Sequence, residues 1–253
     1  MSEPESTYPQ FPPGFWRRVV LHPDKGWIGG AIEDDMHHFR IRFDHSDGVI
    51  VAARSSALRH PWTGCGGAPG HIVERLTGDS LAEVAGRDPK EHCTHLFDLA
   101  VLMAAHAGDT APLVFDMRVA DAADGRTTAT LHCNGEERLR LNLDGTVIAA
   151  PEPYAGLDLK QVSRWKHDLD AETAELMVML RRAVYVSSAR QYMGKMPAGM
   201  HGAQSPLARH APCYNYRAPV VEETISLYET QDFSESGLEP LESLDPLRDF
   251  AAL

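Results

Sequence analysis

The segment HFRIRF, residues 38–43, constrains the fold most, because apolar and polar side chains alternate strictly along it. Successive side chains of a β-strand point to opposite faces of a sheet, so the three apolar residues define a buried face and the other three a polar face. The turn signal SDG at 46–48 then predicts that this strand pairs antiparallel with residues 48–58. A chain built this way needs a second layer to cover the buried face.

The rest of the chain supplies further strands and the helices to cover them. The segment 93–108 has the apolar spacing of a helix and ends at a glycine. We expect an α+β fold of antiparallel β-strands packed by helices, with a helical and loop-rich C-terminal extension. The other expected strands lie at 16–22 and 25–34 and in a block between 112 and 151, and the other helices at 68–76, 80–86 and about 170–192.

The expected domain organisation follows composition. Residues 1–14 are acidic and proline-rich and predict a flexible lead-in. Residues 15–155 form the α+β core, and residues 156–253 form the helical extension. Within the extension, 193–219 is rich in Met, Gly, Pro and His, which is typical either of a lid over a ligand or of an ordinary surface loop, and the tail after it is acidic. We expect one compact domain.

Composition excludes several classes of function. The 253 residues carry a net charge of −12, which argues against nucleic-acid or anionic-membrane partners. The sequence has no apolar run of the roughly 20 residues that cross a bilayer and no signal peptide, so we expect a cytoplasmic protein. In that compartment the four cysteines are expected to be free, metal-binding or catalytic. A homo-oligomeric assembly stays open.

Two helix starts carry candidate metal ligands. Cys65 follows a Pro-Trp-Thr turn, and a helix start favours a thiolate; the alternative is a small buried residue at a helix–sheet junction. His92, Cys93 and His95 lie within one turn of the next helix start. Thiolate and imidazole are preferred ligands of zinc and similar metals. We therefore expect either no cofactor or a single metal ion, zinc or iron, at these four residues.

The turn EDDMHHF at 33–39 offers carboxylates and imidazoles for proton transfer, for a metal, or for a solvated turn only. His38 lies on the polar face of its strand, so we expect it to act as a general base beside Asp35, with Arg40 holding an anionic group. In the alternating pattern, His37 falls on the same side as Phe39, Ile41 and Phe43, which is the buried face. It is therefore expected to affect mainly stability. Tyr214, in the loop-rich segment, completes the candidate catalytic set.

Several unusual segments resemble a bacterial family of domains of unknown function, family 2889. They are DDMHHFRIRFDH, RHPWTGCGGA, DPKEHCTHLFDLA, LRRAVYVSSAR and APCYNY, and they occur in order between residues 30 and 217. The family name implies no activity.

Residues 30–107 also resemble the core of the iron–sulfur cluster assembly scaffold, through GCGGA (64–68), GDSLAEVA (78–85) and HC (92–93). The resemblance implies that Cys65, Cys93 and His92 meet at one end of the sheet, with Asp35 matching the scaffold's aspartate. Glu33 stands where the scaffold has its first cysteine, and the loss of that thiolate puts cluster assembly in doubt.

No nucleotide-binding motif of the G-x-G-x-x-G or G-x-x-x-x-G-K-S/T type occurs. We therefore expect an enzyme that acts on a small organic substrate, aromatic ones included, by His/carboxylate proton transfer. A lyase or decarboxylase of a catabolic pathway fits best, because such chemistry runs without an organic cofactor. The alternative is a non-enzymatic metal or iron–sulfur-binding protein that uses a Cys/His/Asp pocket.

Overall fold

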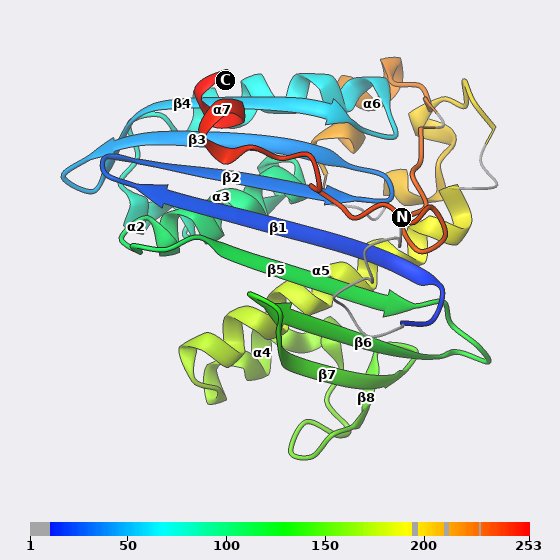
Figure 1. Cartoon of the computed structure of the whole chain (residues 1–253). Coiled ribbons are helices and arrows are strands. Elements are labelled where there is room, and N and C mark those ends of the chain that lie inside the picture. Colours follow the sequence, from blue (N-terminus) through cyan, green and yellow to red (C-terminus); the bar gives the residue numbers. More distant parts are fainter. Residues whose placement is uncertain (1–10, 194–196, 210–212, 228) are drawn as a thin grey trace, which may run out of the picture.

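A computed structural model describes residues 11–193, 197–209, 213–227 and 229–253. Its centre is one eight-stranded antiparallel sheet with the strand order β4-β3-β2-β1-β5-β6-β7-β8 (Figure 1). The strands are β1 (Gly14–Asp24), β2 (Trp27–Asp34), β3 (His38–Ser46), β4 (Val49–Arg59), β5 (Leu113–Ala120), β6 (Arg126–Cys133), β7 (Glu136–Asp144) and β8 (Val147–Ala150).

The sequence predicted this architecture correctly. The α+β class is confirmed, and β3 pairs antiparallel with β4 across the Ser-Asp-Gly turn. Asp47 and Gly48 take positive φ angles of 50° and 77° in that turn, a conformation that Asp and Gly tolerate best. Two four-stranded meanders thus join where β1 pairs with β5.

The helices α1 to α5 follow the two strand blocks, and Figure 1 shows α3 and α5 crossing the same face of the sheet. The first block is followed by α1 (Ala68–Leu76), α2 (Leu81–Val84) and α3 (Thr94–His106), and the second by α4 (Val162–Trp165), α5 (Ala171–Met193), α6 (Val220–Glu223) and α7 (Pro246–Ala251). The expected flexible lead-in falls mostly on residues 1–10, and parts of the expected lid, 194–196 and 210–212, also lie outside the described residues.

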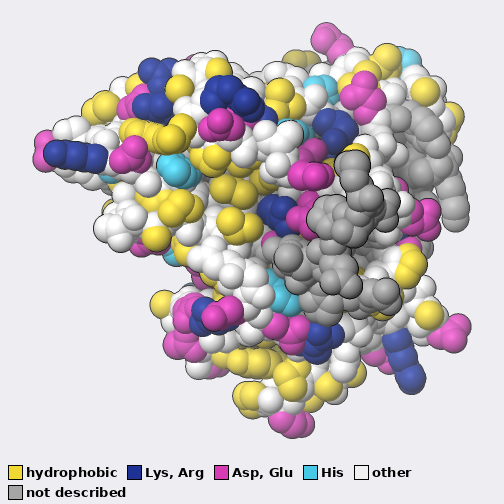
Figure 2. All heavy atoms as spheres, in the orientation of Figure 1, with side chains coloured by type: hydrophobic (Ala, Val, Ile, Leu, Met, Phe, Trp, Pro, Cys, Tyr) yellow, Lys and Arg dark blue, Asp and Glu magenta, His cyan; other side chains and the backbone are white. Residues whose placement is uncertain are grey.

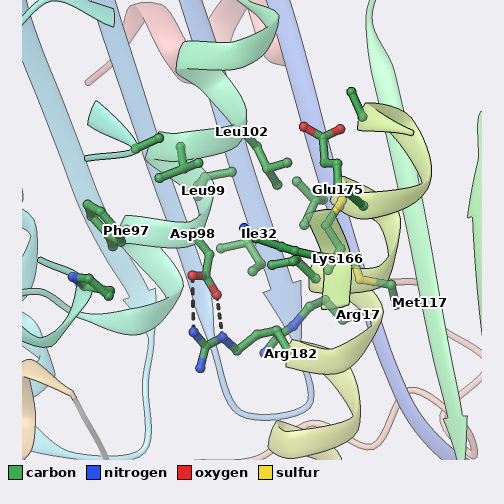
Figure 3. A pocket seen from close by; sticks show the side chains of 18 of the residues that line it. Arg17, Ile32, Phe97, Asp98, Leu99, Leu102, Met117, Lys166, Glu175 and Arg182 are labelled. Atoms are coloured by element: carbon green, nitrogen blue, oxygen red, sulfur yellow. Dashed lines mark hydrogen bonds and ion pairs between the residues drawn. The ribbon is translucent and has the colours of Figure 1, made fainter. Parts of the chain in front are cut away.

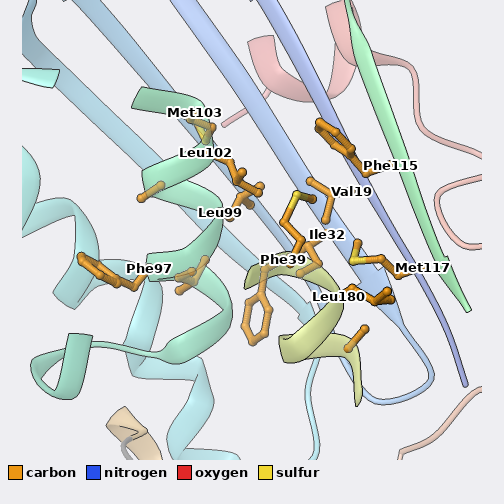
Figure 4. Close-up of a cluster of buried hydrophobic side chains, with 14 of the residues drawn as sticks. Val19, Ile32, Phe39, Phe97, Leu99, Leu102, Met103, Phe115, Met117 and Leu180 are labelled. Atoms are coloured by element: carbon orange, nitrogen blue, oxygen red, sulfur yellow. The ribbon is translucent and has the colours of Figure 1, made fainter. Parts of the chain in front are cut away.

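The main core lies between the sheet and the α3–α5 layer. Phe39, Ile41 and Phe43 of β3 all point into it with exposed fractions of 1% or less, as their alternation predicted. Figure 4 shows Leu99 and Leu102 of α3 on the helix side of this core, together with side chains from the sheet. Burying such side chains stabilises a fold by roughly 1.5–3 kcal/mol each.

The opposite face of the sheet is covered by the C-terminal segment. Phe250 of α7 is fully buried against Gly29, where a Cβ atom would lie only 2.5 Å or less from the ring carbons Cγ and Cδ2. The backbone N–H of Leu241 donates to Glu33, and Arg18 forms an ion pair with Glu239. Around this segment, Figure 2 shows basic and acidic side chains interspersed over the visible face.

A histidine connects the two main helices. His106, the last residue of α3, contacts Asp109 through Nδ1 at 2.8 Å and Glu175 of α5 through Nε2 at 3.0 Å. The Glu175 carboxylate, followed by that of Asp109, raises the pKa of His106 to about 9. The protonated ring therefore holds α3 against α5 at neutral pH.

His106→Gln is expected to lower the free energy of unfolding in a pH-dependent way. Because the folded-state pKa of about 9 lies above the ordinary value of 6.5, the stabilisation is complete below pH 6.5 and lost as the pH rises through 9. Urea unfolding of both proteins between pH 6 and pH 10, with exposed His167→Gln as the control, measures this. An equal difference in stability at both ends of the range would contradict it.

No helix within the described residues is both long and apolar enough to cross a lipid bilayer.

Candidate functional site

The candidate site begins at the turn between β2 and β3. Asp34, the last residue of β2, accepts the backbone N–H groups of Met36 and His37 on Oδ1, each at 2.9 Å. The N–H of Asp34 in turn donates to the carbonyl of His37 at 2.8 Å. Aspartate favours such turns because its short carboxylate bonds to the backbone two and three residues ahead. This turn fixes the position of the His37 ring.

A buried arginine neutralises the same carboxylate. Arg17 lies directly opposite Asp34 in the β1–β2 register, and its Nε and Nη2 donate to Oδ2 at 3.0 and 2.5 Å. The two side chains are 2% and 0% exposed. Burial alone would raise the pKa of Asp34, but His37 and Arg17 outweigh it and hold that pKa well below the usual range. Asp34 is therefore a buried anion at neutral pH.

Two imidazole rings lie next to this anion. The Nδ1 atom of His37 is 3.0 Å from Oδ1 of Asp34, and the ring of His95, from the first turn of α3, stacks on it with centroids 3.7 Å apart. Burial, followed by the His37 and Arg17 charges, lowers the pKa of His95 well below its ordinary value. His95 therefore stays neutral, and two rings this close do not both carry a charge.

These three residues form a group that could hold a metal ion. One ligand atom from each of Asp34, His37 and His95 lies within 4.8 Å of the others, and all three residues are buried. Nε2 of His95 has no hydrogen-bond partner and lies 3.9 Å from Oδ2 of Asp34. No second group of this kind occurs among the described residues, so the predicted ligands Cys65, Cys93 and His92 do not join His95 in one compact set.

A cavity of about 680 Å³ lies beside this centre, between α3 and α5 and above the sheet. Figure 3 shows Arg17, Asp98 and Arg182 at one end of it and Leu102 and Glu175 at the other. Most of its wall is apolar. Because Arg17 both lines the cavity and bonds Asp34, it connects the cavity to the buried His37–His95 pair.

Three thiols gather at the start of α3. Cys93 is the N-cap residue of α3, and its thiol lies near that of Cys213. The Cys93 thiol, assisted by the backbone N–H groups of Asn215 and Thr94, lowers the pKa of Cys213 to about 6. Burial and the neighbouring Cys213 raise the pKa of Cys65. Cys65 and Cys93 thus lie in one neighbourhood, as the scaffold resemblance implied, and Cys213 joins them.

The predicted catalytic residues of the turn are placed on different sides of it. His38 lies on the face covered by the C-terminal segment, where Nδ1 is 3.3 Å from Glu33, and Arg40 pairs with Asp249 of α7 at 3.3 Å. Asp35 instead pairs with Arg190 of α5 at 2.8 Å, and burial together with the Asp34 charge raises the pKa of Asp35 to about 8. The structure therefore gives His38 a different carboxylate partner from the one expected.

Tyr214 and His92 form a separate aromatic cluster with His71. The rings of His71 and Tyr214 are 5.1 Å apart, and His92 stacks on Phe97 with centroids 4.8 Å apart. The N–H of Tyr214 donates to the carbonyl of His92, which ties the loop-rich segment to the start of α3. Burial and the neighbouring His71 lower the pKa of His92 to about 4, so this imidazole is neutral.

Sequence reasoning assigned no individual role to Arg17 or Asp34 and expected His37 to affect mainly stability. A signal for Arg17 exists, because it shares a strand face with the apolar Val19 and Leu21. A charged side chain on a buried face needs a partner, and that partner marks a site.

A comparison of the chain with models of protein families gives no match, and a search among curated proteins gives none either. The resemblances to family 2889 and to the cluster assembly scaffold therefore stay predictions.

Proposed function

We propose that the protein is an enzyme that transfers a proton to or from a small organic molecule, with His37 as the acid–base group. The observation that carries this proposal is the 3.0 Å contact between Nδ1 of His37 and Asp34. A buried carboxylate at Nδ1 keeps the proton on that nitrogen and leaves Nε2 to exchange a proton with a substrate. Arg17 supports the arrangement by fixing the other carboxylate oxygen.

His95 supports the same role. A neutral ring stacked at 3.7 Å limits the positions that His37 can take, and its own unpartnered Nε2 can accept or donate one further hydrogen bond. General acid–base groups of this kind contribute roughly 10²–10⁴ to a rate.

The reaction class that fits is a lyase or decarboxylase. In a decarboxylation, for example, the bond to the carboxylate breaks, CO₂ leaves, and the protonated imidazole supplies the proton that the carbon gains. Such chemistry needs a positioned acid–base group and a place for the substrate beside it. Arg17 contacts Asp34 and also lines the cavity between α3 and α5.

A non-enzymatic or catalytic metal site is the second candidate, favoured by the compact Asp34–His37–His95 group. Zinc or iron would suit these donors. The contacts of Asp34 favour proton transfer over metal binding. Both carboxylate oxygens already accept hydrogen bonds, and a metal ion could bind Oδ2 only if it displaced the positively charged Arg17.

Hydrogen exchange in D₂O tests the proposal across whole classes of substrate at once. The purified protein is incubated with a panel of small carboxylic acids, aromatic ones included, and mass spectrometry follows deuterium uptake at carbon and loss of CO₂. We expect enzyme-dependent exchange or cleavage of at least one class, unchanged after treatment with a chelator. One metal ion per chain, lost in His95→Gln, together with no exchange, would favour the second candidate.

A further inference from the structure

The cavity between α3 and α5 has a defined shape and lining. Its floor includes Val19, Ile32 and Met117 from three neighbouring strands, and Leu99 and Val178 belong to its helical walls. A volume of about 680 Å³ falls in the range of cavities that enclose a small organic ligand. The predominantly apolar wall selects a ligand with a mainly apolar body.

Most charged side chains that line the cavity are paired with a neighbour of opposite charge. Arg17 is paired with Asp34, and Arg182 with Asp98 at 2.5 Å. Glu175 contacts His106 at 3.0 Å, and that histidine is protonated at neutral pH. Asp98 and Glu175, the two carboxylates that line the cavity, therefore each contact a cationic side chain, although Glu175 shares His106 with Asp109.

One cation remains. Lys166 lines the cavity, is half-buried, and has no carboxylate partner among the residues that the structure describes. Arg17, by contrast, directs Nε and Nη2 to Asp34. A partly desolvated cation attracts an anion more strongly than one in water. The cavity thus offers an apolar wall and one lysine ammonium that is not paired with a carboxylate among the described residues.

We propose that this cavity binds a small amphipathic anion, with an apolar body along the α3 and α5 walls and a carboxylate or similar group held by Lys166. That this ligand is also the substrate rests on the proposed function. Its binding does not, because the apolar lining and the unpaired Lys166 are independent of the chemistry at His37.

Octanoate and its neutral relative octanamide are suitable probes, because they share a chain length and differ in charge. With methionine methyl groups labelled with ¹³C, octanoate is expected to shift the NMR signals of Met117 and Met179, which line the cavity, and to leave that of Met36 unchanged. Octanamide should shift the same signals at a roughly tenfold higher concentration. Equal affinities for the two probes, or shifts outside the cavity only, would overturn the proposal.

Two variants locate the anion and the apolar body. Lys166→Met should weaken octanoate roughly tenfold and leave octanamide unchanged. Val178→Trp should abolish binding of both probes by filling the cavity; if it does not fold, the Lys166→Met comparison decides. An unchanged affinity of Lys166→Met for octanoate would overturn the role of the lysine. Octanoate binding without exchange of any compound in D₂O would contradict the proposed function and leave this inference in place. Exchange without octanoate binding would contradict this inference and leave the proposed function in place.

Discussion

Asp34→Asn is expected to lower the free energy of unfolding by about 3–5 kcal/mol, because it leaves the buried guanidinium of Arg17 without its counter-charge. Asn can still accept the backbone N–H groups of the turn, so the loss comes mainly from the ion pair. The pKa of Asp34 is depressed, so the contribution is present above its ordinary value of 3.8 and is lost as the pH falls below it.

Equilibrium unfolding in urea at pH 7 measures this loss. Asp44→Asn is the matched control, since Asp44 also pairs with arginines but its side chain is 22% exposed; we expect a loss of about 1 kcal/mol or less. The double variant Arg17→Met/Asp34→Leu should be considerably more stable than the sum of the two single changes implies, because no charge is then left buried alone. Additive losses would show that the two side chains do not act as a pair.

His37→Gln is expected to lower turnover by roughly a hundredfold or more, and His38→Gln to leave it near the wild-type rate. Glutamine keeps a polar side chain of similar size but cannot exchange a proton. The two histidines are neighbours in sequence, but His37 lies in the β2–β3 turn against His95, and His38 begins β3 and faces Glu33, so each is the other's control. His38 is held by Glu33 on the face that the C-terminal segment covers.

The readout for both variants is the exchange reaction that the D₂O screen is expected to identify, and thermal unfolding is to be measured alongside to check that both variants fold. A large loss in His38→Gln with little loss in His37→Gln would restore the assignment that the sequence alone favoured. Equal, near-wild-type rates would remove the β2–β3 turn from the mechanism.

The fold could be predicted from the sequence to the extent that local patterns determine it. The alternation in β3, the Ser-Asp-Gly turn and the helical spacing of α3 are local, and each was confirmed. The cover over the polar face of β3 could not be predicted in this way. Leu241 donates to Glu33 across 208 residues, and no periodicity in either segment specifies that contact.

The candidate site was predicted only in part for the same reason. The acidic and imidazole residues at 33–38 were identified, but their pairing depends on the turn that Asp34 closes and on Arg17, which lies across the sheet on β1. The alternation of apolar and polar residues correctly predicted that His37 is on the buried side. It assigned that face to packing alone, because a sequence does not indicate that a second imidazole, His95, stacks there.

The tautomer of His37 tests the central claim most directly. Long-range ¹H–¹⁵N NMR of protein labelled at its histidines distinguishes a protonated ring nitrogen from an unprotonated one. With the His37 ring neutral, we expect the proton on Nδ1, facing Asp34, and a bare Nε2 available to a substrate. The Asp34→Asn variant should lose this preference. A proton on Nε2 in the wild-type protein would contradict the role of the Asp34–His37 pair as the proton-transfer centre.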